Sequence, residues 1–296
     1  MSNWLVIGPT SFTGGHFVDY LESRKQDIRG ATLRNWENLE TLIARRPDYI
    51  VNFAAINVVA QSWLYPEKYM DVNVFRFSSL LELMRHDPPK RYIHISTPEI
   101  YGNVTGRIRE SQPFNPSTPY AVSRAAQEML LECYRKQYGF PVVYTRGCNV
   151  YGPGQQLYRL IPKVIACIKR GVKFPLEGGG HSVRSFLHVS DVCRAIYDVA
   201  VKGEVGEAYH LSSPLSWSIA GLVETICGMM GINPKDVVEI IQDRPGKDTA
   251  YLLDDTKLRR LGWNDNVSMD DGLREVIAWM TDNWDKLKDK SMEYSL

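Results

Sequence analysis

The sequence predicts an α/β fold in which a doubly wound parallel sheet is joined to a smaller α+β domain. Strand patterns that are apolar throughout alternate with helical patterns over the first half of the chain, as in a parallel sheet covered on both faces. A turn bracketed by Gly8 and Gly14 follows the first strand. After Tyr151 the texture changes to shorter helices separated by loops rich in glycine and proline, which indicates a second unit.

The first elements leave room for fewer strands than usual. A buried strand is expected over Trp4–Ile7, followed by a helix that runs to about Arg24. The short stretch 25–48 holds one strand near 28–33 and one helix over 35–46, where a standard dinucleotide-binding half has two strand–helix units. The sheet is therefore expected to be Rossmann-like but to lack one βα unit after the first helix.

The later elements complete the sheet and define two domains. Further strands are expected over Tyr49–Ala55, Tyr92–Ser96 and Val142–Thr145. A helix over Ser190–Val201, with Ser190-Asp191 as its N-cap, is expected to return to the sheet. The last helix is expected over Asp270–Trp284, with a solvated charged tail beyond it. We divide the chain into a first domain, 1–150 with 183–213, and a second domain, 151–182 with 214–296.

Composition excludes several classes of function. Lys and Arg total 35 against 34 for Asp and Glu, so the basic excess of a nucleic-acid or membrane-surface protein is missing. The five cysteines are odd in number and form no CxxC pair, so we expect neither a disulfide framework nor a metal site. No apolar run approaches the length of a membrane span. We expect a cytoplasmic enzyme.

The turn at Gly8–Gly14 has the context of a phosphate-binding loop. It connects a strand to a helix, whose N-terminal N–H groups and positive dipole end favour an anion such as a pyrophosphate. Ser11 stands at the middle glycine of the usual spacing, with Phe12 and Thr13 after it. Glycine is common in any strand-to-helix turn, so the loop alone is a weak signal.

A set of reactive side chains follows the strand that ends at Ser96. Thr97 and Glu99 come directly after it, at the edge where α/β sheets bind ligands. Tyr120 and Arg124 are four residues apart and share one face of the next helix. A phenol acts as a base near neutral pH only with positive charge nearby, which Arg124 supplies.

The chain resembles the extended short-chain dehydrogenase/reductase family over nearly its whole length. Within it the resemblance is to the NAD-dependent epimerase/dehydratase branch, and most of all to the nucleotide-sugar 4,6-dehydratases of the dTDP-glucose type. Beyond the motifs above, it is carried by Ala54-Ala55 with Ser62, Asn73, the run Arg146–Gln155, Leu160-Ile161-Pro162, Gly178–Gly180 with Val183–Val192, and Asp243–Gly246 with Asp248 and Tyr251.

The resemblance implies the roles of these residues. It implies catalysis by Thr97, Glu99, Tyr120 and Arg124, and substrate binding by Ser62, Asn149, Arg184 and Arg244, of which the arginines grip phosphates. It implies that NAD is held by Gly8, Ser11, Phe12, Thr13, Gly14, Arg34, Ala54, Ala55, Asn73, Ser96, Tyr120 and Arg124. The implied reaction is oxidation at C4 of a nucleotide-diphosphate sugar, loss of water across C5 and C6, and return of the hydride to C6.

The chain departs from the family pattern at several positions. Arg124 replaces a lysine, keeping the charge but losing any proton relay. Pro98 replaces an aspartate that acts as an acid in many 4,6-dehydratases, so Glu99 or a water takes over its work. Thr249-Ala250 stands where an arginine is common. Arg34, if it reaches the adenosine ribose, would favour NADP over NAD, whereas a solvated arginine would leave the choice open.

Other functions stay open at this point. A nucleotide-sugar 4-epimerase needs Thr97, Tyr120 and the cofactor but no carboxylate, so Glu99 is the residue that argues against it. A lyase acting across C5 and C6 without a lasting 4-ketone is also open. An inactive sugar-nucleotide-binding relative is suggested by Arg124, Ser11 and the lost βα unit. The family likeness suggests a homodimer. The sequence specifies neither the sugar nor the base.

Overall fold

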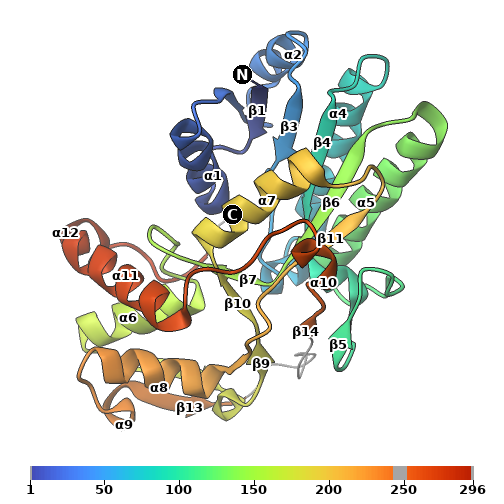
Figure 1. Ribbon diagram of the computed structural model, residues 1–296. Coiled ribbons are helices and arrows are strands. Elements are labelled where there is room, and N and C mark those ends of the chain that lie inside the picture. The colour runs from blue at the N-terminus through green and yellow to red at the C-terminus, as the bar shows by residue number, and fades with distance from the viewer. Residues whose placement is uncertain (1, 243–251, 295–296) are drawn as a thin grey trace.

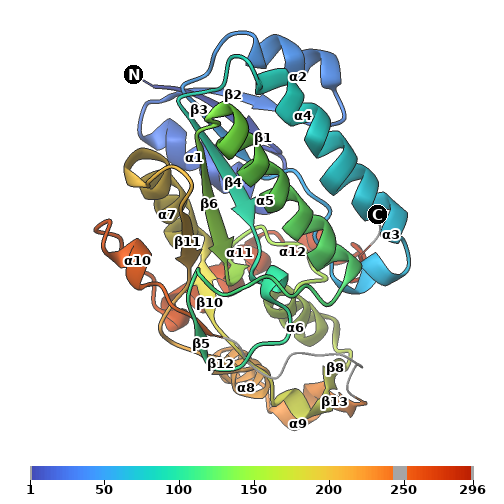
Figure 2. The same ribbon diagram turned by 90° about the vertical axis from the view of Figure 1, so that its right-hand side faces the viewer.

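The computed structural model describes residues 2–242 and 252–294. Its centre is a six-stranded sheet in the order β11-β6-β4-β3-β1-β2, with every neighbouring pair parallel (Figures 1 and 2). The strands are β1 (Asn3–Ile7), β2 (Asp27–Ala31), β3 (Tyr49–Asn52), β4 (Arg91–Ser96), β6 (Val142–Gly147) and β11 (Ala208–Leu211). The predicted parallel sheet is thereby confirmed.

Helices cover both faces of the sheet. On one face lie α1 (Phe12–Ser23) and α7 (Val189–Lys202), and on the other α2 (Trp36–Ile43), α4 (Arg76–Met84) and α5 (Pro119–Tyr138). Alternate residues of β1 reach the two cores, since Trp4 and Val6 pack with α1 and α7 while Leu5 packs with the opposite helices. This arrangement explains why the strands read as apolar throughout.

The sheet lacks one strand–helix unit, as expected. Only β2 and α2 separate α1 from β3, and β2 forms the edge of the sheet beside β1. A sheet with the usual 3-2-1-4-5-6 order would carry one more strand outside it. The predicted strand near 28–33 is β2, and the predicted helix over 35–46 is α2, capped by the side chain of Asn35.

Two predicted boundaries are wrong for identifiable reasons. The strand expected over Tyr49–Ala55 ends at Asn52, because the Asn52 side chain accepts a hydrogen bond from the Ala54 backbone and turns the chain. The helix expected to be capped by Ser190-Asp191 begins at Val189, and its N-cap is His188, whose ring accepts from the Ser190 backbone. Asp191 lies in the first turn of this helix.

A second unit lies below the sheet in Figure 1 and has its own core. Its larger helices are α6 (Leu160–Arg170), α8 (Ile219–Met229) and α11 (Met269–Asp282). The smaller elements of the chain are α3 (Pro66–Met70), α9 (Pro234–Val237), α10 (Thr256–Arg259), α12 (Trp284–Leu287), β5 (Arg107–Ile108), β7 (Asn149–Tyr151), β8 (Phe174–Glu177), β9 (Val183–Arg184), β10 (Phe186–His188), β12 (Trp217–Ser218), β13 (Val238–Ile241) and β14 (Leu252–Leu253).

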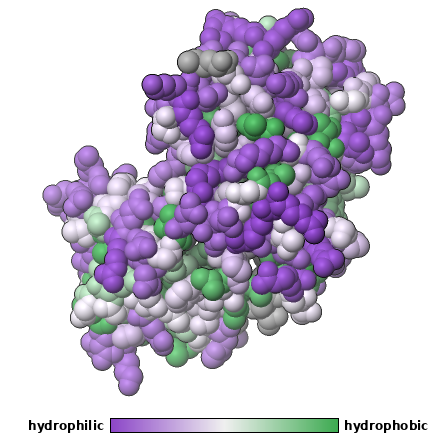
Figure 3. Space-filling view, in the orientation of Figure 1, coloured by the Kyte–Doolittle hydropathy of each residue, from purple (hydrophilic) through white to green (hydrophobic). Residues whose placement is uncertain are grey.

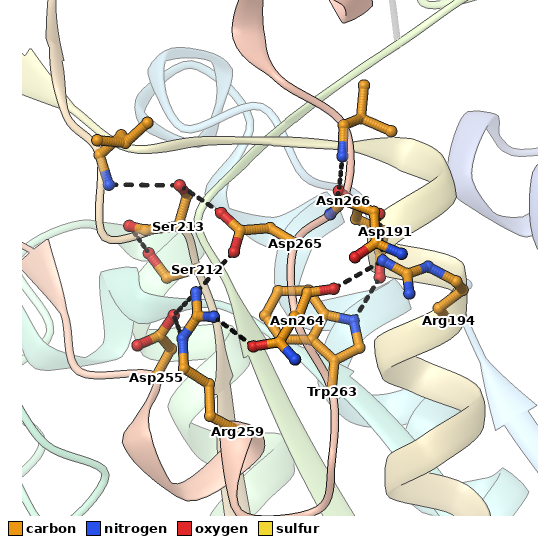
Figure 4. Close-up of polar contacts among 12 residues, drawn as sticks. Asp191, Arg194, Ser212, Ser213, Asp255, Arg259, Trp263, Asn264, Asp265 and Asn266 are labelled. Atoms are coloured by element: carbon orange, nitrogen blue, oxygen red, sulfur yellow. Dashed lines mark hydrogen bonds and ion pairs between the residues drawn. The ribbon is translucent and has the colours of Figure 1, made fainter.

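A polar cluster joins the segment after α10 to α7 (Figure 4). The buried carboxylate of Asp191 accepts from the backbones of Asn266 and Val267, at 2.9 and 3.0 Å, and pairs with Arg194. Trp263 donates to the Asp191 carbonyl and packs into the core between the sheet and helices α1 and α7. Trp263 therefore belongs with the sheet by packing, although it lies within 214–296, and the division into domains stays a prediction.

The expected solvated, charged tail after the last helix is confirmed for its charged residues beyond Leu287, which are exposed, but not for Met292 and Tyr294. The side chain of Met292 packs against the second core, and the ring of Tyr294 contacts the ring of Tyr158 at 5.1 Å between centroids. The face shown in Figure 3 is mostly hydrophilic, with hydrophobic residues scattered over it. Among the described residues no helix has the length and apolar character needed to cross a membrane.

Candidate active site

The loop after β1 is shaped for close backbone approach. Gly8 has φ +88°, a conformation that favours glycine. A Cβ on Gly14 would lie 2.2 Å from the Gly8 carbonyl oxygen, so a larger residue could not occupy that position without moving the loop. Ser11 replaces the middle glycine at the N-cap of α1. Its hydroxyl donates to the Gly8 carbonyl at 2.7 Å and accepts from the Gly14 backbone at 3.2 Å.

The neighbouring loops meet this turn at the same edge of the sheet. A Cβ on Gly8 would be only 3.1 Å from the Ala54 nitrogen, so the loop of Ala54 and Ala55 lies directly against the glycine turn. Arg34 is exposed just after β2, which runs parallel to β1. These strands therefore bring to one edge the residues assigned to the cofactor.

Asn73 fixes the loop that follows β3. It lies in a π-type turn, Asp71–Phe75, between α3 and α4, and such turns are frequent at functional sites. Its fully buried amide pairs with both backbone groups of Ile56, each at 3.0 Å, and donates to the Ser123 hydroxyl at 3.0 Å. Asn73 thus ties this loop to α5 and acts on the site by positioning it.

Thr97 and Glu99 are placed by a short 3₁₀ helix that begins where β4 ends. Thr97 caps this helix, and its side-chain oxygen accepts from the Glu99 backbone at 3.3 Å. Pro98 occupies the first helical position, where the missing N–H costs nothing. Thr97 is nearly buried, whereas Glu99 is half-buried.

Tyr120 and Arg124 occupy the first two turns of α5. Thr118 caps the helix by accepting from the Ala121 backbone at 3.1 Å, and Pro119 starts it. The ring of Tyr120 meets the buried ring of Tyr69 edge-on, at 6.2 Å between centroids. The first turns of α5 lie against the 3₁₀ helix of Thr97 and Glu99, so the structure brings the predicted catalytic residues to one place.

Two buried polar atoms in this place lack partners in the described part of the chain. Arg124 is 4% exposed and its guanidinium donates to the Ile95 carbonyl, but its Nε atom has no hydrogen-bond partner there. The same holds for the hydroxyl of Ser96 at the end of β4. Buried polar atoms are normally satisfied, so unsatisfied ones suggest a site that a ligand completes.

A saturated network lies one helical turn further along α5. The buried guanidinium of Arg146 forms a two-pronged pair with Glu128, at 3.0 and 2.6 Å, and donates to the Tyr101 hydroxyl. That hydroxyl lies 2.7 Å from His210 Nε2, and His210 Nδ1 faces the Asp254 carbonyl. Burial lowers the pKa of His210 to about 3, so the ring is neutral and donates from Nδ1.

The predicted substrate residues lie apart from the catalytic group along the chain. Asn149 lies on β7 and donates to the Ser185 carbonyl at 3.2 Å, and Arg184 lies on β9 and donates to the Val183 carbonyl at 2.9 Å. Ser62 is fully buried, and its hydroxyl donates to the Val59 carbonyl at 2.6 Å. Arg244 lies outside the described residues. The substrate-binding roles of these four residues stay predictions.

The structure adds residues that the sequence analysis missed. Tyr69 packs on Tyr120, and Arg159, at the start of α6, donates to the Asn57 side chain at 3.1 Å. This hydrogen bond joins the second unit to the loop after β3. No motif marks these positions, because their importance comes from contacts between distant segments.

A cavity of about 660 Å³ lies away from the catalytic residues. It is lined by residues of α5, β6 and β11, among them Glu128, Tyr144 and Arg146, and by none of the predicted site residues. This cavity is therefore not the site of the predicted catalytic residues. Among residues 2–242 and 252–294 no group of metal-ligating side chains is found.

Comparison with known proteins supports a single family. The protein-family model described as GDP-mannose 4,6 dehydratase matches residues 16–276 of this chain. A dTDP-glucose 4,6-dehydratase from Xanthomonas campestris pv. campestris is 32% identical, with 96% of this chain and 94% of the relative covered. A trifunctional Arabidopsis thaliana enzyme that includes a UDP-glucose 4,6-dehydratase is 35% identical over 88% of this chain. The chain spans about two fifths of that plant enzyme, 39% of its length.

Solved structures show the same likeness. A dTDP-glucose 4,6-dehydratase from Streptomyces venezuelae, solved with NAD bound, has a TM-score of 0.89 at 30% identity and covers 96% of this chain and 98% of its own. A UDP-glucose 4-epimerase from Thermotoga maritima has a TM-score of 0.87 at 26% identity and covers 95% of this chain and 99% of its own.

Proposed function

Since this chain belongs to the extended short-chain dehydrogenase/reductase family, in the nucleotide-sugar dehydratase branch matched by the GDP-mannose 4,6 dehydratase model, we propose that it is an NAD-dependent nucleotide-sugar 4,6-dehydratase. The observation that carries the proposal is the position of Glu99. Glu99 lies on the short 3₁₀ helix that Thr97 caps, and α5, which carries Tyr120, packs against that helix, which supports a shared site for the three side chains. Dehydration needs a carboxylate there, and epimerisation at C4 does not.

The residues present fit NAD. The glycine turn leaves no space for a side chain at Gly14, so the start of α1 packs tightly against Gly8, and the N–H groups at that start favour a pyrophosphate. Ser96 and Arg124 each keep a buried polar atom that a ligand could satisfy. Bound NAD supplies the redox step by accepting electrons from the sugar and later giving them back. We assign Arg34, which is exposed after β2, to the adenosine end of the cofactor, where it would also accept the 2′-phosphate of NADP.

The protein side chains handle the protons. Tyr120 takes the proton of the sugar 4-hydroxyl, assisted by the Thr97 hydroxyl, and the buried Arg124 guanidinium contributes positive charge to the site. The resulting 4-ketone makes the C5 hydrogen acidic. Glu99 removes that proton and delivers one to the departing 6-hydroxyl, which leaves as water. Return of the hydride to C6 and of one proton to C5, equivalent to the proton that Tyr120 took, leaves the loss of one water as the net change, with the cofactor regenerated.

The substrate is a nucleotide-diphosphate sugar whose phosphates are held by Arg184 and Arg244. A guanidinium binds phosphate oxygens with two parallel hydrogen bonds, which suits it to this task. Asn149 and Ser62 complete the proposed substrate contacts. Arg184 lies on β9, beside β12 and at the second unit, which supports a site between the glycine turn and that unit.

The test is a pair of variants given dTDP-glucose, UDP-glucose and GDP-mannose. In Tyr120→Phe the oxidation step should nearly vanish, with a fall of about 10²–10⁴ in rate. In Glu99→Gln oxidation should persist without water loss, so reduced cofactor and a 4-keto sugar accumulate. Stopped-flow absorbance follows the cofactor, and mass spectrometry detects the lost water. Glu37→Gln, an exposed carboxylate on α2, serves as the control.

The 4-epimerase is the competing function, and the structural likeness to UDP-glucose 4-epimerases gives it a basis. An epimerase would return a product of unchanged mass, and Glu99→Gln would turn over at the wild-type rate. Either result would replace the dehydratase assignment. Binding of a nucleotide sugar without any turnover would point to the inactive relative.

We also propose a homodimer that works in the cytoplasm. Phe75, before α4, is 68% exposed, and Val122 and Met129, seven residues apart on α5, are 42% and 61% exposed. Large exposed apolar side chains gathered on one face favour contact with a second copy. All five cysteines are free, as suits a reducing compartment. Light scattering after gel filtration should give twice the mass of one chain.

A further inference from the structure

The tail after α12 is held against the second unit before it reaches Tyr158. The guanidinium of Arg170 donates to the carbonyls of Leu287 and Lys290, at 3.2 and 2.6 Å. Met292 then packs against the core of the second unit. These contacts fix the direction in which the tail leaves, and so they fix where Tyr294 lies.

Tyr294 belongs to a cluster of side chains at the boundary between the second unit and the loop after β3. Its ring meets Tyr158 edge-on, at 5.1 Å between centroids and 74° between planes. Next in sequence, Arg159 places its guanidinium over the Tyr158 ring and donates to Asn57 in the first domain. Tyr294 therefore joins a contact that bridges the second unit and the loop after β3.

Tyr69, near this cluster, contacts Tyr120. Tyr69, on α3, donates to the Val58 carbonyl and packs edge-on against Tyr120. The pKa of Tyr69 is raised to about 12, first by burial and then by the neighbouring phenols of Tyr294 and Tyr120. Figure 2 shows α3 next to α4 beside the sheet, and the contacts described above between Tyr294 and this part of the molecule run through Tyr158 and Arg159.

We propose that Tyr294 is a positioning residue that closes the nucleotide-sugar cleft beside Tyr120 and holds the sugar against the catalytic phenol. An aromatic ring covers a large area at little cost in conformational entropy, which suits a residue that contacts a sugar only when the substrate is present. Closure also keeps water from the 4-keto intermediate. The inference rests on the proposed function, because the cleft must hold a nucleotide sugar.

The experiment compares Tyr294→Ala and Tyr294→Phe in the NAD-loaded enzyme. We expect Tyr294→Ala to raise both the KM and the calorimetric Kd for dTDP-glucose about tenfold. The kcat should change less, and NAD content and the thermal midpoint should stay as in wild type. Tyr294→Phe keeps the ring and should stay within about twofold. Tyr138→Ala, a half-exposed tyrosine at the far end of α5, is the matched control and should behave as wild type.

The outcomes separate this inference from the proposed function. If the wild-type enzyme binds none of dTDP-glucose, UDP-glucose and GDP-mannose, both proposals fail. If it binds one of them and Tyr294→Ala binds that sugar equally well, the positioning role alone fails. A Tyr294→Ala enzyme that loses NAD or melts early would show that the residue holds the fold together, and would also overturn the inference.

Discussion

Two arginines of the first domain are buried to nearly the same degree and are used in opposite ways. Arg124 is 4% exposed and Arg146 is 5% exposed. The guanidinium of Arg146 is surrounded by acceptors, with Glu128 on one edge and the Tyr101 hydroxyl and Glu110 carbonyl on the other. Arg124 reaches the Ile95 carbonyl, and its Nε has no partner among the described residues.

The difference shows how one helix serves both stability and chemistry. Burial by itself lowers the pKa of Arg146, but the Glu128 carboxylate outweighs that effect and raises the pKa, so the charge is neutralised within the fold. The charge of Arg124 is left for a ligand or for Tyr120. Residues 124 and 128 are neighbours on α5, so a single turn of helix separates the two uses.

The largest expected effect is on the free energy of unfolding, at Arg146, whose guanidinium nitrogens are all hydrogen-bonded. Arg146→Met would leave the Glu128 carboxylate buried without its partner, which typically costs about 3–5 kcal/mol. Urea unfolding should show this loss as a lower midpoint. Adding Glu128→Met to Arg146→Met should restore much of it, because no lone charge then remains buried. If Arg146→Met were as stable as wild type, the contrast between Arg146 as a structural residue and Arg124 as a site residue would be wrong.

The second-largest expected effect is on activity, at Arg124. Arg124→Met should lower kcat about 10²–10³-fold, the usual loss when one preorganised donor is removed from an active site. Its free energy of unfolding should change by less than about 1 kcal/mol. Arg124→Lys keeps a positive charge and should retain most of the activity. If Arg124→Met is severely destabilised but fully active when folded, the two arginines have the same role.

The smallest effect is a pH dependence of stability at His210. Its folded pKa of about 3 lies below the unfolded value of about 6.5, so the stabilisation is complete above pH 6.5 and is lost as the pH falls toward 3. Between pH 7 and pH 5 this amounts to about 2 kcal/mol. Urea unfolding of His210→Gln should show a pH slope shallower by that amount, whereas His86→Gln, with an exposed ring, should keep the wild-type slope.

How much the sequence could predict depended on whether a feature was local. The parallel sheet, the lost βα unit and the grouping of Thr97, Glu99 and Tyr120 follow from strand patterns and their order. The N-cap of α7 was missed because His188 caps it with a ring nitrogen, where a hydroxyl or carboxylate is usual. The place of Tyr294 was missed because it depends on packing between residues far apart in sequence, which no local pattern encodes.

The lost βα unit has a consequence at the rim of the sheet. Among residues 2–242 and 252–294 no strand pairs with the outer side of β2, and edge strands of this kind can pair with other chains. The strand is only five residues long, and it carries Asp27 and Arg29, whose side chains form an ion pair at 3.6 Å. Short charged strands resist intermolecular pairing. The short length of β2 and its two charges therefore both disfavour pairing of this edge with another chain.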